Sequence, residues 1–285
     1  MHCRRRSPRL PVAVALAVAC LGIAPAVAQR AEPIVELALS YYQPAFDTTV
    51  RLDSAELGTG TDLSLEDDLG VEDDASELRG EVAIRLGSRF HLVLDHVEFE
   101  RSGSNVLGRS VQFGDVVYAA NAELDASIES SHTGAALRWS FVRNPTSDLA
   151  VSLGVTQLDV AAGISGRAIT TANGAPVGSV DVAEKGDASG PVPLIGLHGL
   201  FWLGDRLRLR IDGRYIDIGE LVDEDKWSGS MTEYGASVDY FVLPWLGLGV
   251  GYAGTAIDVD FNDGDELGSV DYDFDGLRGT VTLLF

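Results

Sequence analysis

Cysteine is almost absent from this chain. It contains only Cys3 and Cys20, and both fall in an N-terminal stretch with the features of a cleaved export signal. After cleavage the exported protein would hold no thiol. Disulfide bonds, a catalytic cysteine and a cysteine metal site are therefore excluded from the mature chain.

Basic residues are also scarce. Lys and Arg number 21 against 43 Asp and Glu, which gives a formal net charge of −22. The export signal would remove four of the arginines and make the mature chain more acidic still. No nucleic-acid partner is expected, because nucleic acids are bound through an excess of basic side chains.

Long apolar runs are missing beyond the N-terminal stretch. No later segment reaches the roughly 20 apolar residues that a transmembrane helix needs. Any insertion into a membrane must then be by a closed β-barrel, the other structure that satisfies every backbone hydrogen bond in lipid. The 32 glycines and the short apolar runs also favour strands over helices.

The first 28 residues are interpreted as a signal for the export translocase. Basic residues open the segment, the run Leu10–Ile23 is apolar, and Ala26-Val27-Ala28 forms a small-residue cleavage site before Gln29. Two other interpretations stay open. The segment is nearly long enough to remain as a membrane anchor, and Ala17–Cys20 resembles a lipoprotein processing site.

Strand-like segments alternate with short and long polar connections over residues 29–285, as in bacterial outer-membrane barrels. Four short connections carry turn-forming residues, at 87–89, 144–148, 204–205 and 243–245. Five longer acidic or Gly-rich segments lie near 52–73, 102–120, 166–189, 220–228 and 261–270. With both termini in the periplasm, this pattern predicts an all-β, up-and-down antiparallel transmembrane barrel of about ten strands, with eight or twelve as alternatives.

Alternation within the strands predicts which side chains face the lumen, because neighbours on a strand point to opposite faces. In Leu78–Leu86 the even positions are apolar and the odd ones mostly charged, and Leu207–Tyr215 repeats this pattern. The apolar rows would face outer-membrane lipid. The predicted lumenal charges are Glu36, Glu77, Arg79, Glu81, Arg85, Arg138, Arg208, Arg210, Asp212, Arg214, Glu233, Asp239 and Arg278.

Alternation alone would also fit a soluble β-sandwich, but the placement of aromatic residues favours a membrane barrel with two interfacial belts. One belt is predicted near the short turns, from Phe90, Trp139, Phe141, Phe201, Trp202, Tyr240, Phe241, Trp245 and Phe285. The other is predicted near the long loops, from Tyr41, Tyr42, Phe99, Tyr215, Tyr234 and Tyr252. The segments Phe90–Phe99 and Val192–Leu203 have apolar residues at both odd and even positions. Which of their side chains face the lumen therefore stays unassigned, and a bulge is possible there.

In the last segment every second residue belongs to one outward-facing row, whose final members are Val281, Leu283 and Phe285. This row resembles the signature that outer-membrane barrels present to the barrel-assembly machinery, which is the predicted partner. A glycine usually stands five residues before the terminal aromatic. Here Thr280 occupies that position and Gly279 precedes it.

A wider resemblance covers roughly the first half of the mature chain. The stretches Leu65–Asp74, Phe90–Leu94, Glu100–Ser104 and Val111–Asp115 resemble a family of uncharacterised Gram-negative outer-membrane barrel proteins. The resemblance implies a barrel fold and an outer-membrane location. It implies no activity and no functional residues.

The predicted lumenal charges have two interpretations. A barrel of about ten strands is narrow, and buried charges need partners. The favoured interpretation is therefore a polar core of ion pairs that makes the barrel rigid. The alternative is a small pore whose selectivity is set by the same charges.

The acidic loops also have two interpretations, either solvated charge, which is favoured, or hard oxygen ligands for divalent cations. The carboxylates are Asp62, Glu66, Asp67, Asp68, Glu72, Asp73 and Asp74 in the first loop, with Asp260, Asp263, Asp265 and Glu266 in the last. The run Asp271–Gly276 begins like a calcium loop, but Thr282 replaces the bidentate glutamate. Its aspartates share the parity of the lipid-facing row, so they must lie above the hydrocarbon or follow a bulge at Gly276.

The histidines give little support for an enzyme. His91 and His198 lie near predicted periplasmic turns, and only His132 could face the lumen near Ser130 and Glu129. No catalytic residue, cofactor or metal ligand is predicted. The leading hypothesis is a non-enzymatic outer-membrane barrel that serves envelope structure or small-solute passage. The alternatives are a surface-binding module that uses its acidic loops and, third, an outer-membrane hydrolase or acyltransferase.

Overall fold

The computed structural model describes residues 33–54, 58–113, 116–118, 122–172, 175–217, 227–262 and 267–285. The predicted export signal and its cleavage site lie outside this part of the chain. Within it, no helix is long and apolar enough to cross a membrane.

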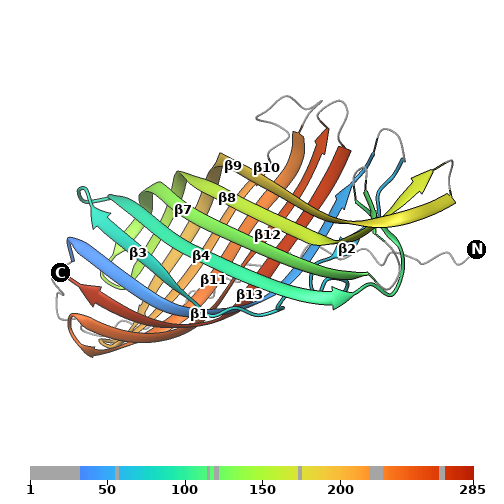
Figure 1. Ribbon diagram of the computed structural model, residues 1–285. Coiled ribbons are helices and arrows are strands. Elements are labelled where there is room, and N and C mark those ends of the chain that lie inside the picture. The colour runs from blue at the N-terminus through green and yellow to red at the C-terminus, as the bar shows by residue number, and fades with distance from the viewer. Residues whose placement is uncertain are drawn as a thin grey trace, which may run out of the picture.

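Ten long antiparallel strands form the wall of a closed barrel in the described residues (Figure 1). They are β1 (Val35–Leu52), β3 (Glu77–Arg85), β4 (Phe90–Val106), β7 (Glu123–Asn144), β8 (Ser147–Ala172), β9 (Ala175–Leu203), β10 (Leu207–Asp217), β11 (Trp227–Leu243), β12 (Leu246–Asn262) and β13 (Leu267–Leu284). Each pairs with the next in sequence, and β13 pairs with β1 to close the wall. The prediction of an up-and-down barrel of about ten strands is confirmed.

Three short strands lie outside this wall: β2 (Leu63–Ser64), β5 (Val111–Phe113) and β6 (Val116–Tyr118). β2 pairs with β1 at Thr49 and Val50, and β6 pairs with β8 at Ala168. All three belong to the long connections, so they lie at the end of the barrel opposite the tight turns.

The four predicted short turns are confirmed. They join β3 to β4, β7 to β8, β9 to β10, and β11 to β12. Gly204 has a φ of +77°, a left-handed conformation that glycine adopts without a steric penalty. The C-terminal end of β13 lies at this same end of the barrel (Figure 1).

The prediction of a long loop over residues 166–189 is wrong. β8 and β9 continue through this region and pair as far as Ala172 and Ala175. Its Gly, Pro and Ser content suggested a loop, but pairing between the two strands satisfies the backbone groups there, apart from the N–H that proline lacks. The last predicted loop is also shorter than expected, because β12 reaches Asn262 and β13 begins at Leu267.

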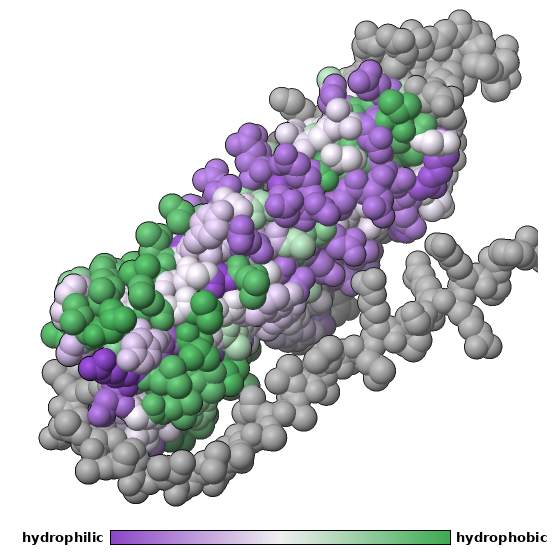
Figure 2. All heavy atoms as spheres, turned by 90° about the horizontal axis from the view of Figure 1, so that it is seen from below, coloured by the Kyte–Doolittle hydropathy of each residue, from purple (hydrophilic) through white to green (hydrophobic). Residues whose placement is uncertain are grey.

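Only part of this barrel can lie in lipid. β8 has 26 residues, whereas a strand needs roughly 9–11 residues to cross the hydrocarbon core. Figure 2 shows hydrophobic residues gathered at the end that holds the tight turns and hydrophilic residues over the other half. We call the first part the membrane half and the second the protruding half.

The surface of the membrane half is apolar in the way that lipid requires. Five aliphatic side chains there are 61–71% exposed, namely Leu153, Ile195, Leu197, Val250 and Leu277. Most of the predicted aromatic belts also point outward. Tyr42, Phe99, Trp202 and Phe241 are exceptions because their strand parity directs them inward. Tyr42, Phe99 and Phe241 are buried, and the Trp202 ring packs against that of Phe241.

The two unassigned segments have clear faces and no bulge. On β4 Val93, Asp95 and Val97 point inward, and on β9 Leu194 points inward while Ile195 is exposed. Register shifts occur elsewhere, at Ser140/Val142 on β7, at Thr170/Thr171 on β8 and at Phe241/Leu243 on β11.

The last strand is regular from end to end. β13 pairs with β1 and β12 without a register shift at Gly276, so no bulge intervenes there. Asp271 and Asp273 are exposed because they lie above the apolar band. Near the C-terminus, Val281 and Phe285 are exposed on the lipid-facing side.

Candidate functional site in the barrel lumen

Nearest the tight turns, the charged side chains of the lumen are arranged around Arg208 of β10. Its guanidinium donates to Glu36 of β1 at 2.9 and 3.0 Å and to Asp239 of β11 at 3.0 and 2.8 Å. Arg208 and Asp239 are each 1% exposed. The rings of Trp202 and Phe241 lie 5.6 and 4.9 Å from the guanidinium carbon. This level is therefore an ion-pair layer, buried at Arg208 and Asp239, that joins opposite sides of the wall.

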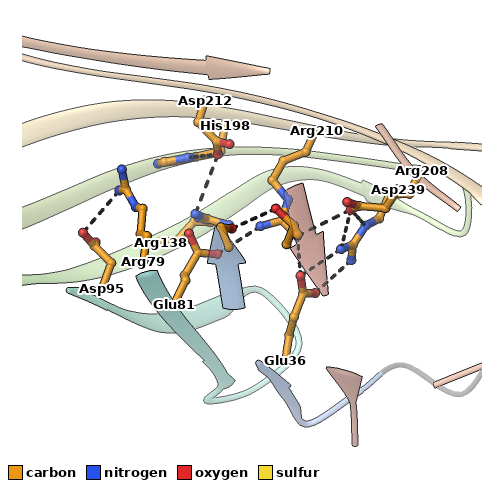
Figure 3. A network of polar contacts seen from close by, with 12 residues as sticks. Glu36, Arg79, Glu81, Asp95, Arg138, His198, Arg208, Arg210, Asp212 and Asp239 are labelled. Carbon is orange, nitrogen blue, oxygen red and sulfur yellow. Dashed lines mark hydrogen bonds and ion pairs between the residues drawn. The ribbon is translucent and has the colours of Figure 1, made fainter. Parts of the chain in front are cut away.

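Arg210 extends this layer across the barrel. It donates to Glu36 at 2.5 Å and to Glu81 of β3 at 3.0 Å. Figure 3 shows Arg210 between these two carboxylates, with Arg208 and Asp239 alongside. Charges from four strands thus meet at this cross-section.

A second group of ion pairs lies further from the tight turns. Arg214 donates to Asp95 of β4 at 3.2 Å and also contacts Glu233 of β11. Arg79 of β3 approaches Asp95 from the other side, at 3.4 Å. One carboxylate therefore links two arginines across the lumen.

His198 of β9 connects a serine to a carboxylate. Its Nε2 lies 2.7 Å from Ser152 Oγ on β8, and its Nδ1 lies 2.8 Å from Asp212 Oδ1 on β10. Arg138 Nη2 is 4.0 Å from the same Asp212 oxygen. The order serine, histidine, carboxylate is the one used for nucleophilic catalysis. The adjoining cavity, however, has a volume of about 50 Å³, which is enough for a few waters.

The structure brings together most of the residues predicted to face the lumen. Among the described residues, Glu77 and Arg278 have no ion pair, and Arg85 lies beside the first tight turn in register with His91. The prediction that His132 alone among the histidines could face the lumen is wrong, because His198 also faces it. Asp95 was not among the predicted lumenal charges. Asp95 lies in a segment with apolar residues at both odd and even positions, so alternation could not show which way its side chain points.

Above the charged levels the interior becomes aromatic. Tyr42, Phe46, Phe99, Tyr272 and Phe274 are buried, and their ring centroids lie 5.1–6.4 Å apart. His132 is also buried and packs edge-on against Phe99 and Phe274. Glu129, in contrast, is exposed on the outer face, so it cannot serve as the partner of His132.

The first long loop is folded into the mouth of the barrel. Arg101 of β4 is 1% exposed and donates to Glu66 Oε1 at 2.7 Å, to the Glu72 carbonyl at 3.0 Å and to Thr48 Oγ1 at 3.0 Å. The favoured interpretation of Glu66 as solvated loop charge is therefore wrong. The loop residues Leu63, Leu65, Leu69 and Val71 are also buried. We call residues 63–72 the capping loop.

The outer face of the protruding half is acidic. Carboxylates oppose each other across neighbouring strands at Glu100 and Glu129, and again at Asp258 and Asp271. Partial desolvation and the neighbouring carboxylates of Asp258 and Asp260 raise the pKa of Asp271. Within the described ranges, no three acidic, His or Cys side chains converge as a metal site.

No family model matches the chain, and no curated protein matches it in sequence. The barrel is similar to the outer membrane protease OmpT from Escherichia coli, with a TM-score of 0.59 and 12% identity over 91% of this chain and 99% of that chain. Weaker likenesses include the Ralstonia pickettii toluene transporter TbuX, with a TM-score of 0.36 and 10% identity over 90% of each chain. The Yersinia pestis attachment invasion protein Ail gives a TM-score of 0.25 and 9% identity over 87% of this chain and 99% of that chain.

These comparisons concern the fold. The likeness to OmpT, together with the closed wall and the apolar band, shows the fold of an outer-membrane β-barrel. Its 12% identity carries no activity over to this chain.

Proposed function

We propose that this protein is a non-conducting outer-membrane barrel that supports its protruding half as a binding surface outside the cell. The observation that carries this proposal is the closure of the lumen at three levels. These are the ion-pair layer at Arg208, the packed aromatic residues around Phe99, and the capping loop held by Arg101. Closed levels of this kind favour a rigid support over a route for solutes.

The length of the strands supports the same view. β7, β8 and β9 have 22, 26 and 29 residues, about two to three times what the hydrocarbon core requires. A barrel that only anchored itself in the membrane would not need them. The protruding half carries its own buried apolar core, so it forms a stable platform.

The chemistry of the platform indicates the kind of partner. Exposed carboxylates surround it, and we call this set the acidic collar: Asp47, Glu98, Glu100, Glu129, Asp258, Asp271 and Asp273. Complementary charge steers association and sets specificity. A cationic peptide or protein surface is the proposed partner.

The test compares binding of a fluorescent oligoarginine peptide to the refolded barrel in nanodiscs. A variant with Glu98, Glu100 and Glu129 changed to Gln should bind at least tenfold more weakly at low salt. The control changes Glu77, which faces the lumen, to Gln and should bind like the parent. Equal binding by the collar variant and the parent would reject the acidic collar as the binding surface.

A hydrolase is a second candidate, favoured by the hydrogen-bonded chain Ser152, His198 and Asp212. The small cavity beside Ser152 opposes it, since no ester substrate fits there without a movement of the wall. A fluorophosphonate probe that labels the folded parent but not Ser152→Ala would support this candidate. Absence of labelling at a concentration that saturates a control serine hydrolase would remove it.

A further inference from the structure

One strand of the wall has a long open edge in the protruding half. β9 has 29 residues, but its neighbour β10 has 11 and pairs with β9 only from Ile195 onward. Within the described ranges, no strand pairs with residues 175–194 on that side of β9. In Figure 1 the yellow hairpin of β8 and β9 projects from the end of the barrel opposite the tight turns. Its edge therefore presents backbone groups that no described strand uses.

The other short strand of the wall is different, because the chain covers the gap that it leaves. β3 has nine residues, and the first long loop lies above it between β1 and β4. On the β1 side, Phe46 N donates to the Asp73 carbonyl at 2.8 Å. On the β4 side, Glu72 N donates to the Ser102 carbonyl at 3.3 Å. The open edge of β9 is therefore not a general consequence of having a short neighbour.

The register shows which residues of β9 direct their backbone groups to the open edge. Trp202 N donates at 2.7 Å to the carbonyl of Thr146, the residue before β8. Even-numbered residues of β9 therefore bond toward β8, and odd-numbered residues point their N–H and C=O groups away from it. The ladder with β8 keeps this register from Phe201 to Gly178, so the rule holds along the open edge.

Proline limits where another strand can pair with this edge. Pro191 and Pro193 are exposed and odd-numbered, so the N–H that each lacks would point to the open edge, the position that proline tolerates in a sheet. No proline lies in residues 179–189, which we call the edge window. Every odd-numbered residue there offers both an N–H and a C=O group. Ala183 and Ser189 of the window are exposed.

We propose that the edge window binds an extended, basic polypeptide segment of a partner by strand addition. Backbone hydrogen bonds supply affinity in this mode of recognition. The sequence of the window contains Asp181, Glu184 and Asp187 against one basic residue, Lys185, so basic side chains on the partner match its charge. The inference rests on the proposed function for the charge of the partner, and it adds the conformation in which the partner binds.

The test uses two fluorescent peptides of alternating Lys and Thr and the refolded barrel in nanodiscs. One peptide is unmodified. The other is N-methylated at two adjacent central residues, which removes one N–H from each edge of the peptide and keeps its charge. The unmodified peptide should bind at least tenfold more tightly, and equal binding of the two peptides would overturn strand addition. Failure of the acidic collar is distinguishable, since the collar variant would then bind the unmodified peptide like the parent.

A proline substitution tests the edge from the side of the barrel. Ala183→Pro removes one N–H from the open edge and leaves the bonds to β8 in place, because residue 183 is odd-numbered. Val182 is already in a strand, as the residue before a proline prefers. Binding of the unmodified peptide should fall at least tenfold. The control Ala183→Ser keeps the N–H and should bind like the parent, and parent-like binding by both variants would overturn the proposal.

Hydrogen exchange of the parent gives an answer that needs no variant to fold. In the free barrel, odd-numbered amides of the edge window should exchange faster than even-numbered amides, which bond to β8. Saturating unmodified peptide should slow the odd-numbered amides at least tenfold. Odd-numbered amides that are already protected in the free barrel would show that the edge is covered, and that result would overturn the proposal.

Discussion

At the scale of single residues, the barrel depends on charges that are buried in pairs. Alternation along Leu207–Tyr215 was sufficient to place Arg208, Arg210 and Arg214 in the lumen, because strand parity is a local property. Their partners could not be predicted. Arg208 contacts Glu36, which is 172 residues away, and nothing local fixes which strands face each other across the lumen.

Loss of Arg208 should destabilise the barrel strongly. Arg208→Met leaves Glu36 and Asp239 close together with Arg210 as their shared counter-charge, at an expected cost of about 3–5 kcal/mol. The measurement is urea unfolding of the refolded protein in lipid vesicles. Arg206→Met is the matched control, since Arg206 is exposed two residues away and should change stability by less than about 0.5 kcal/mol. Equal midpoints for both variants would contradict the role given to the ion-pair layer.

Replacing Asp271, in contrast, should stabilise the barrel. Its raised pKa means that the folded state favours the protonated carboxyl, so stability is lost as pH rises and Asp271 ionises beside Asp258. Asp271→Asn should therefore stabilise the barrel at pH 7, by about 0.2–1 kcal/mol for an opposed like-charge pair. The gain should disappear below the ordinary carboxyl pKa of 3.8, where both forms are neutral. A gain that is constant with pH would show that charge is not its cause.

At the scale of elements, the sequence predicted the strands and tight turns better than the long connections. The turns at Gly204 and Pro145 carry local geometric signals. The hairpin of β8 and β9 does not, because its Gly and Pro content is that of a loop and its ladder depends on pairing at long range. The capping loop escaped prediction for a related reason. Its acidic composition suggested an exposed loop, although four of its apolar residues are buried.

The capping loop should be released when its ion pair is broken. Leu69 is 0% exposed, and the mature chain has no cysteine of its own under the predicted cleavage, so Leu69→Cys is a clean reporter. A membrane-impermeant maleimide should react with it at least tenfold faster when Glu66→Gln is added. Asp67→Gln serves as the control, because Asp67 is exposed in the same loop. Equal slow reaction in all three proteins would show that Arg101 and Glu66 do not hold the loop.

At the scale of the whole molecule, the barrel divides into a membrane half and a protruding half. The sequence predicted the closed barrel, the strand number and the lipid-facing rows, because these follow from periodicity and composition. It could not predict that the strands continue far beyond the membrane, since alternation looks the same in water and in lipid when one face is buried. A charge-paired lumen was the favoured prediction, but the aromatic cluster and the capping loop above it were not predicted, because they depend on contacts between residues far apart in the sequence.

Single-channel conductance of the refolded mature chain in a planar bilayer tests the central claim most directly, with heat-modifiable gel mobility as proof of folding. We expect a silent bilayer at neutral pH, both for the parent and for a variant that lacks the capping loop, because the ion-pair layer at Arg208 stays closed. Reproducible, ion-selective steps from the folded parent would contradict a sealed lumen and identify the protein as a channel.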